Sequence, residues 1–114
     1  MASKKIGKAT VKFTNPPIIA GTGTIVGPME GRGPLAKDID VILPDLTFGE
    51  KTGERSERKL LEQAAQIAIE RSGIDKGMID YYIAGDLLNQ IISASFSARQ
   101  LAIPFLGVYG ACST

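Results

Sequence analysis

The residues best suited to chemistry in this sequence follow two short apolar segments. Cys112 comes shortly after residues 104–109, and Asp86 comes directly after residues 78–84. A thiol that follows a strand and begins a helix lies in the positive field of the helix N-terminus, which lowers the thiol pKa. Cys112 is therefore a candidate nucleophile, and Ser113 beside it is a candidate binding residue.

The same cysteine has a simpler interpretation. A cysteine between alanine and serine commonly packs as a small apolar residue. A nucleophilic thiol also needs a base or a proton shuttle, which is normally a histidine. The 114 residues contain no histidine and only one cysteine. The residues alone leave both interpretations of Cys112 open.

Asp86 also has two interpretations. An aspartate after a strand commonly caps a helix or forms an Asx-turn. Its functional alternative is a carboxylate that lines a crevice together with Asn89 and Gln90. Ligands of parallel sheets bind outside the carboxyl ends of the strands, where Asp86 and Cys112 would meet. The candidate ligand-binding set is therefore Asp86, Asn89, Cys112 and Ser113.

One helix and several short strands would position these residues. The clearest element is a helix over residues 54–72, because its apolar residues recur at i, i+3, i+4 and i+7. Glu54 and Glu57 suit its N-terminal end, and Gly73 suits the left-handed position after its last turn. A second helix is predicted within residues 87–101, with Ser93 or Ser95 as N-cap.

The strands are predicted at residues 9–13, 18–26, 78–84 and 104–109, and residues 39–43 could pair at an edge. The order strand, helix, strand, helix, strand is typical of an α/β fold with parallel pairing and crossover helices.

Composition excludes several classes of function. Thirteen basic and twelve acidic residues give no concentrated basic face for nucleic acid, and the cluster Lys4, Lys5, Lys8 and Lys12 reads as a solvated tail. The glycines at 21, 23 and 27 do not match the dinucleotide fingerprint. With no histidine, one thiol and no spaced carboxylate loop, neither a metal site nor any cofactor is predicted.

No apolar run could span a membrane, and a single cysteine favours a reducing, intracellular compartment.

Four segments resemble the stage V sporulation protein AD family of spore-forming bacteria. They are AGTGTIVGPMEGRGPL (20–35), ERKLLEQA (57–64), AGDLLNQ (84–90) and IPFLGVYGACST (103–114). The resemblance runs in order over essentially the whole chain. It implies a thiolase-like α/β fold with crossover helices and a mixed sheet, related to the ketoacyl synthases. Residues 1–114 would be the first part of its N-terminal half, with the natural chain continuing beyond Thr114.

The resemblance also implies a function. Cys112 matches the acyl-carrying cysteine of thiolase relatives, and the family binds dipicolinic acid (pyridine-2,6-dicarboxylic acid) for uptake, with calcium, into the developing spore. Implied partners are membrane proteins of the same sporulation operon and, in the full-length protein, a second copy that pairs through residues 104–109. The expected location is the cytoplasmic side of the developing spore, peripheral to its inner membrane. The alternatives are an acyltransferase or condensing enzyme that uses Cys112, and a fragment that folds only with its missing part.

Overall fold

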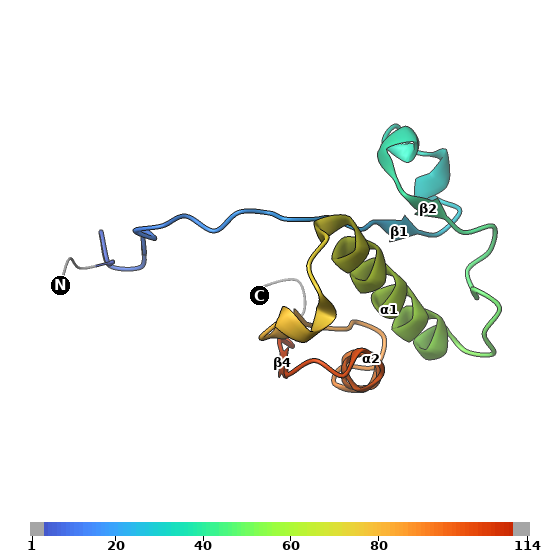
Figure 1. Cartoon of the computed structure of the whole chain (residues 1–114). Coiled ribbons are helices and arrows are strands. Elements are labelled where there is room, and N and C mark those ends of the chain that lie inside the picture. The colour runs from blue at the N-terminus through green and yellow to red at the C-terminus, as the bar shows by residue number, and fades with distance from the viewer. Residues whose placement is uncertain (1–3, 111–114) are drawn as a thin grey trace.

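The computed structural model describes residues 4–110 and arranges two helices with two small parallel sheets. Helix α1 (Gly53–Ser72) lies between the β1–β2 pair and helix α2 (Ile92–Leu101) (Figure 1). The strands are β1 (Ile25–Val26), β2 (Val41–Ile42), β3 (Tyr82–Ala84) and β4 (Phe105–Gly107). Short 3-10 turns occupy Glu30–Arg32, Ala36–Asp38 and Lys76–Met78.

Helix α1 confirms the helix predicted over residues 54–72. The Thr52 hydroxyl oxygen accepts a 3.3 Å hydrogen bond from the Arg55 backbone N–H, which satisfies one free donor of the first turn. Gly73 adopts φ 67°, the left-handed conformation that ends helices at low cost for glycine. Both ends of the long helix are therefore set by local sequence.

Strands β1 and β2 pair in parallel, with Ile25 opposite Val41 and Val26 opposite Ile42. The edge strand predicted within residues 39–43 is confirmed, but only the last two residues of the predicted strand 18–26 join a ladder. The strand predicted over residues 9–13 is wrong, because this region holds only an isolated antiparallel bridge between Lys5 and Val11.

The segment that enters β1 crosses the surface of α1 at very short range. A Cβ atom built on Gly21 would lie 2.5 Å from the Ala68 carbonyl oxygen, and one on Gly23 would overlap the Ala64 carbonyl oxygen. Glycine is required at both positions because a real side chain would push the two backbones apart.

An ionic staple holds this segment, β2 and the end of α1 together. One carboxylate oxygen of Asp40 accepts hydrogen bonds from the Thr24 backbone N–H (2.8 Å) and hydroxyl (2.9 Å). The other carboxylate oxygen lies 2.5 Å from the Arg71 guanidinium. Asp40 therefore links the residue before β1, the start of β2 and the last turn of α1.

Because of this staple, the free energy of unfolding changes with pH in the acidic range. The hydrogen bond from the Thr24 backbone is the main cause that lowers the pKa of Asp40 below its usual 3.8; partial burial opposes it, and Arg71 lowers the pKa further. The folded state therefore binds this proton less readily than the unfolded chain. The stabilisation from Asp40 is present above pH 3.8 and is lost as the pH falls through the lower, folded-state pKa.

We expect Asp40→Asn to destabilise the fold at neutral pH and to flatten the fall of unfolding free energy as the pH drops from about 5 toward 2. Urea denaturation across this range measures the difference from wild type. The Thr47 hydroxyl and the backbone of residues 47–48 also lower the pKa of Asp45, but that contribution is common to both proteins. Asp38→Asn is the control, since the Asp38 side chain makes no hydrogen bond or ion pair with residues 4–110. Parallel pH profiles for wild type and Asp40→Asn would contradict the role of the staple.

Strand β3, helix α2 and strand β4 form the parallel crossover unit that the sequence predicts. Tyr82 pairs with Phe105, Ile83 with Leu106 and Ala84 with Gly107. The predicted mixed sheet is wrong for residues 4–110, where the strands form two separate parallel pairs.

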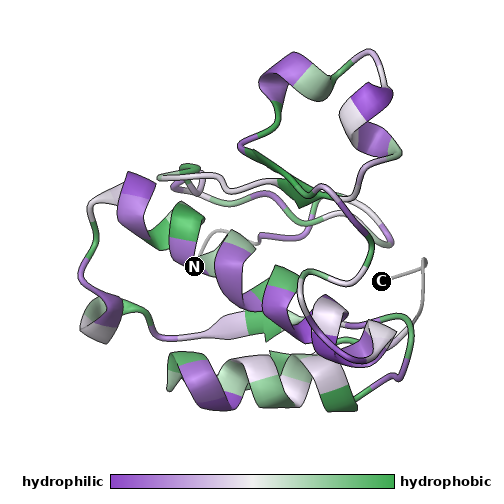
Figure 2. Ribbon diagram, turned by 90° about the vertical axis from the view of Figure 1, so that its right-hand side faces the viewer, coloured by the Kyte–Doolittle hydropathy of each residue, from purple (hydrophilic) through white to green (hydrophobic). Residues whose placement is uncertain are grey.

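Helix α2 packs on α1 through small side chains, and Figure 2 shows the two helices side by side. Its buried residues are Ser93, Ala94, Ser97, Ala98 and Leu101. Small residues let the helix backbones approach closely. A 2.9 Å hydrogen bond joins the Ser97 and Tyr82 hydroxyls, and burial raises the pKa of Tyr82 despite that bond, so its phenol stays neutral. The predicted N-caps Ser93 and Ser95 are wrong, because both lie inside the helix.

Candidate functional site

Asp86 caps helix α2. One of its carboxylate oxygens accepts a 2.8 Å hydrogen bond from the Ile91 backbone N–H, and the other accepts a 2.6 Å bond from the Ala94 N–H. Both oxygens thus satisfy donors that the first turn of the helix would otherwise leave unpaired. The capping interpretation of Asp86 is confirmed, and its ligand-binding role stays a prediction.

The turn between Asp86 and α2 is strained at one residue. Ile91, which precedes the first residue of α2, has φ 83°. A positive φ is unfavourable for a β-branched residue, and such conformations persist where surrounding bonds impose them. The hydrogen bond from the Ile91 N–H to Asp86 is one of these bonds.

Glu57 of α1 fixes the residues that follow Asp86. Its Oε1 atom accepts hydrogen bonds from the backbone N–H groups of Leu87 (2.9 Å) and Leu88 (3.2 Å). Its Oε2 atom is buried and has no hydrogen-bond partner among residues 4–110. The sequence indicated only a helix-dipole role for Glu57. Its hydrogen bond to Leu87 joins residues thirty positions apart, and no pattern around Glu57 predicts it.

The carboxyl ends of β3 and β4 lie together, as the parallel prediction requires. The Val108 backbone N–H donates a 3.0 Å hydrogen bond to the Ala84 carbonyl. The next residue, Gly85, faces the Val108 carbonyl so closely that a Cβ atom would overlap it. Cys112 and Ser113, the two predicted site residues that follow β4, lie outside the described residues.

Asn89 lines a cleft of about 430 Å³ between the first turns of α1 and the start of α2. Its other lining residues are Thr52, Glu54, Arg55, Arg58, Ile92, Ser93 and Phe96. Asp86 is not among the lining residues. The structure therefore separates these two predicted site residues: Asn89 lines a cleft with two arginines, and Asp86 caps α2. Arg55, Arg58 and Phe96 are functional candidates that sequence reasoning missed.

Arg58 is one of the two arginines that line this cleft. Its guanidinium lies 6.0 Å from the centre of the Phe96 ring, within reach of a cation–π interaction. Its Nε atom lies 3.2 Å from Glu62 Oε1, an ion pair that is not aligned as a hydrogen bond. The Arg58 side chain as a whole is 43% exposed, so its terminal N–H groups are available to an anionic group even though Nε is buried.

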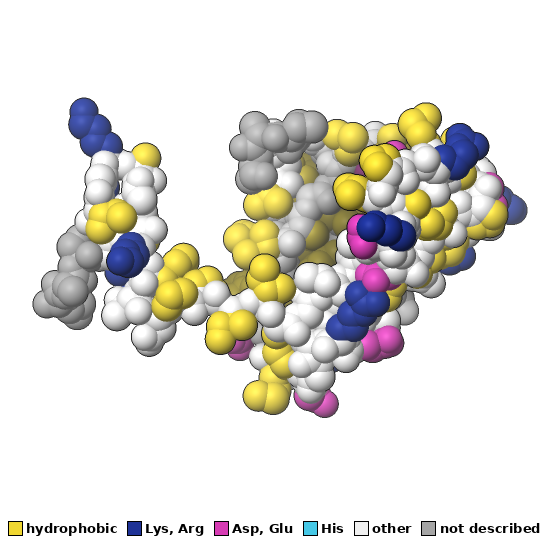
Figure 3. Space-filling view, turned by 90° about the horizontal axis from the view of Figure 1, so that it is seen from above, with side chains coloured by type: hydrophobic (Ala, Val, Ile, Leu, Met, Phe, Trp, Pro, Cys, Tyr) yellow, Lys and Arg dark blue, Asp and Glu magenta, His cyan; other side chains and the backbone are white. Residues whose placement is uncertain are grey.

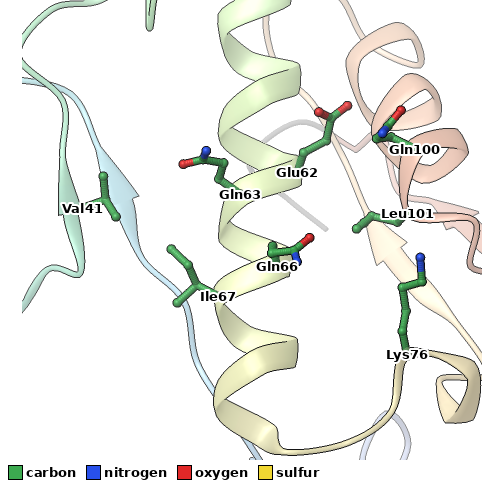
Figure 4. A pocket seen from close by; sticks show the side chains of 8 residues that line it. All are labelled: Val41, Glu62, Gln63, Gln66, Ile67, Lys76, Gln100 and Leu101. Carbon is green, nitrogen blue, oxygen red and sulfur yellow. The ribbon is translucent and has the colours of Figure 1, made fainter.

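A second groove, of about 630 Å³, crosses α1 (Figure 4). Glu62, Gln100, Leu101 and Lys76 lie on one side of α1, whereas Val41 lies on the other. One acid, one base and several amides line it, so its charge favours neither anions nor cations. Neither Asp86 nor Asn89, the two predicted site residues within residues 4–110, borders this groove, and the smaller cleft is the better candidate site.

Residues 4–110 contain neither a cluster of metal-ligating side chains nor a membrane-spanning helix. No group of three or more histidine, cysteine or acidic side chains gathers there to hold a metal ion. In the same part of the chain, neither helix has the length and apolar character needed to cross a membrane.

These features define a small α/β unit with two helices and short parallel strands. The family described as "Stage V sporulation protein AD (SpoVAD)" matches residues 7–114. A relative with that name from Bacillus subtilis (strain 168) is 41% identical over 111 residues, which are 97% of this chain and 33% of the relative. The chain belongs to the stage V sporulation protein AD family, a family of sporulation proteins, and spans about a third of the length of that relative.

Proposed function

We propose that this chain is part of a sporulation protein that binds dipicolinic acid and assists its uptake into the developing spore. Membership of the stage V sporulation protein AD family supports the biological role. The observation that carries the binding site is the cleft in which Asn89 lies with Arg55 and Arg58. In the thiolase-like fold that we propose for the whole protein, this cleft contributes one wall of the ligand pocket.

The chemistry of the cleft fits an aromatic dianion. Dipicolinate carries two carboxylates in the plane of a pyridine ring, and guanidinium groups bind carboxylates through two parallel hydrogen bonds. Arg55 and Arg58 supply such donors, and the Asn89 amide can donate one more. Phe96 and Ile92 offer apolar surface to the ring. Glu54 is the acidic residue of the lining and would direct the anion toward the arginines.

Titration calorimetry of the full-length protein with dipicolinate tests this site. We expect Arg58→Gln to weaken binding about tenfold or more, because a charged hydrogen bond is worth roughly 1.5–3 kcal/mol. Arg99→Gln is the matched control, since Arg99 is an exposed arginine of α2 outside the cleft lining. No binding heat from wild type at millimolar ligand would reject the function. Wild-type affinity in Arg58→Gln would place the ligand elsewhere.

The proposal includes a homodimer of the full-length protein and docking on membrane proteins of the same operon. Within residues 4–110, β4 pairs only with β3, so its other edge is open. An open edge strand is a template for pairing with another chain. Leu106 of β4 is also 54% exposed, which adds apolar surface beside this edge.

A further inference from the structure

An arm formed by residues 4–19 extends away from the helices (Figure 1). It begins with a small hairpin, in which the Ile6 backbone N–H donates to the Thr10 carbonyl (3.0 Å) and the Lys12 N–H donates to the Lys4 carbonyl (2.7 Å). The two sides of this hairpin meet at the isolated antiparallel bridge between Lys5 and Val11. The arm is thus a shaped element that the site described above does not use.

The arm carries a charge opposite to that of the rest of the chain. Residues 4–19 contain four lysines and no acidic residue, a net charge of +4. Residues 20–114, called the body here, contain nine basic and twelve acidic residues, a net charge of −3. The net charge of the whole chain is near zero because a basic arm is joined to an acidic body.

The arm also exposes large apolar side chains between its lysines (Figure 3). Ile6 is 62% exposed, Val11 59% and Phe13 55%, and beyond the hairpin Ile18 and Ile19 are 89% and 82% exposed. Apolar groups interleaved with lysines are typical of segments that lie in the interface of an anionic bilayer.

We propose that residues 4–19 dock this protein on the surface of an anionic lipid bilayer. The lysines bind anionic headgroups, and Phe13 with its apolar neighbours enters the interface between headgroups and acyl chains. A nucleic acid would satisfy the lysines but would leave these aliphatic side chains in water, so the lipid surface is the better partner. This inference is independent of the dipicolinate cleft.

Sedimentation of the full-length protein with lipid vesicles tests the proposal. We expect binding to vesicles of equal parts phosphatidylglycerol and phosphatidylcholine, little binding to phosphatidylcholine alone, and release in about 1 M salt, where the screening length is ~3 Å. The triple variant Lys4→Gln, Lys8→Gln, Lys12→Gln should bind roughly tenfold more weakly or worse. A second variant, Phe13→Ser, keeps the charge and should also weaken binding.

The matched control is Lys37→Gln, Lys51→Gln, Lys76→Gln, which removes three exposed lysines from the body and gives the same net charge. This control should bind vesicles like wild type. Equal losses in both triple variants would overturn the proposal, as would absence of vesicle binding or equal binding to phosphatidylcholine. Binding to a short DNA duplex without binding to vesicles would assign the arm to nucleic acid instead.

Discussion

Replacing Gly23 by alanine is expected to destabilise the fold by about 3 kcal/mol, the upper end of the cost of overpacking. A Cβ at this position would lie 2.9 Å from the Ala68 nitrogen, 3.0 Å from the Ile67 Cβ and still closer to the Ala64 carbonyl oxygen. These neighbours are mainly backbone atoms inside α1, so they cannot rotate away. Urea denaturation measures the loss.

Gly27→Ala is the control for Gly23→Ala, because the added methyl changes the unfolded chain equally. A Cβ on Gly27 would meet the Leu46 Cδ2 atom at 3.5 Å, an ordinary van der Waals contact. This variant should be neutral or more stable by about 0.5 kcal/mol. Similar denaturation midpoints for the two variants would show that β1 does not pack on α1 as described.

Replacing Asp86 by alanine is expected to cost about 2–3 kcal/mol, since two backbone donors of α2 lose a charged acceptor. Asp86→Asn keeps one acceptor oxygen and should fall between alanine and wild type. Unfolding free energy and hydrogen exchange of the Ala94 amide measure the effect.

Asp80→Ala is the control, because the exposed Asp80 side chain makes no hydrogen bond or ion pair with the described part of the chain. Equal stability of Asp86→Ala and Asp80→Ala would contradict the cap. Dipicolinate titration of the folded Asp86 variants separates the cap from the predicted ligand role: unchanged affinity would restrict Asp86 to structure.

The elements that the sequence predicted correctly are those with local causes. The apolar period of residues 54–72 and Gly73 at its end define α1, and the parallel pairing of β3 with β4 follows from the intervening helix. Capping was one of the two interpretations that the place of Asp86 after a strand allowed, and it is the one that the hydrogen bonds confirm. In each case the residues that decide the structure are neighbours in the sequence or one crossover apart.

The elements that the sequence did not predict depend on distant contacts. Residues 18–24 have the composition of a strand, but the close approach of Gly23 to α1 leaves them without a ladder. The sequence did not predict the cleft, because Arg58 appears there only as one charge on an amphipathic helix. In the structure, Asn89 from the turn before α2 and Phe96 from α2 line the same cleft as Arg58. The charges and their spacing within α1 do not indicate which residues from elsewhere in the chain lie near Arg58.

The small-residue face of α2 limits how this protein can diverge. Two serines and two alanines occupy the buried positions 93, 94, 97 and 98, and Ala94 and Ser97 have no exposed surface. Substitution at these positions is therefore confined to compact side chains. An exposed position of α2 outside the cleft lining, such as Arg99, should accept side chains of any size, so the inner face of α2 is the more restricted of the two.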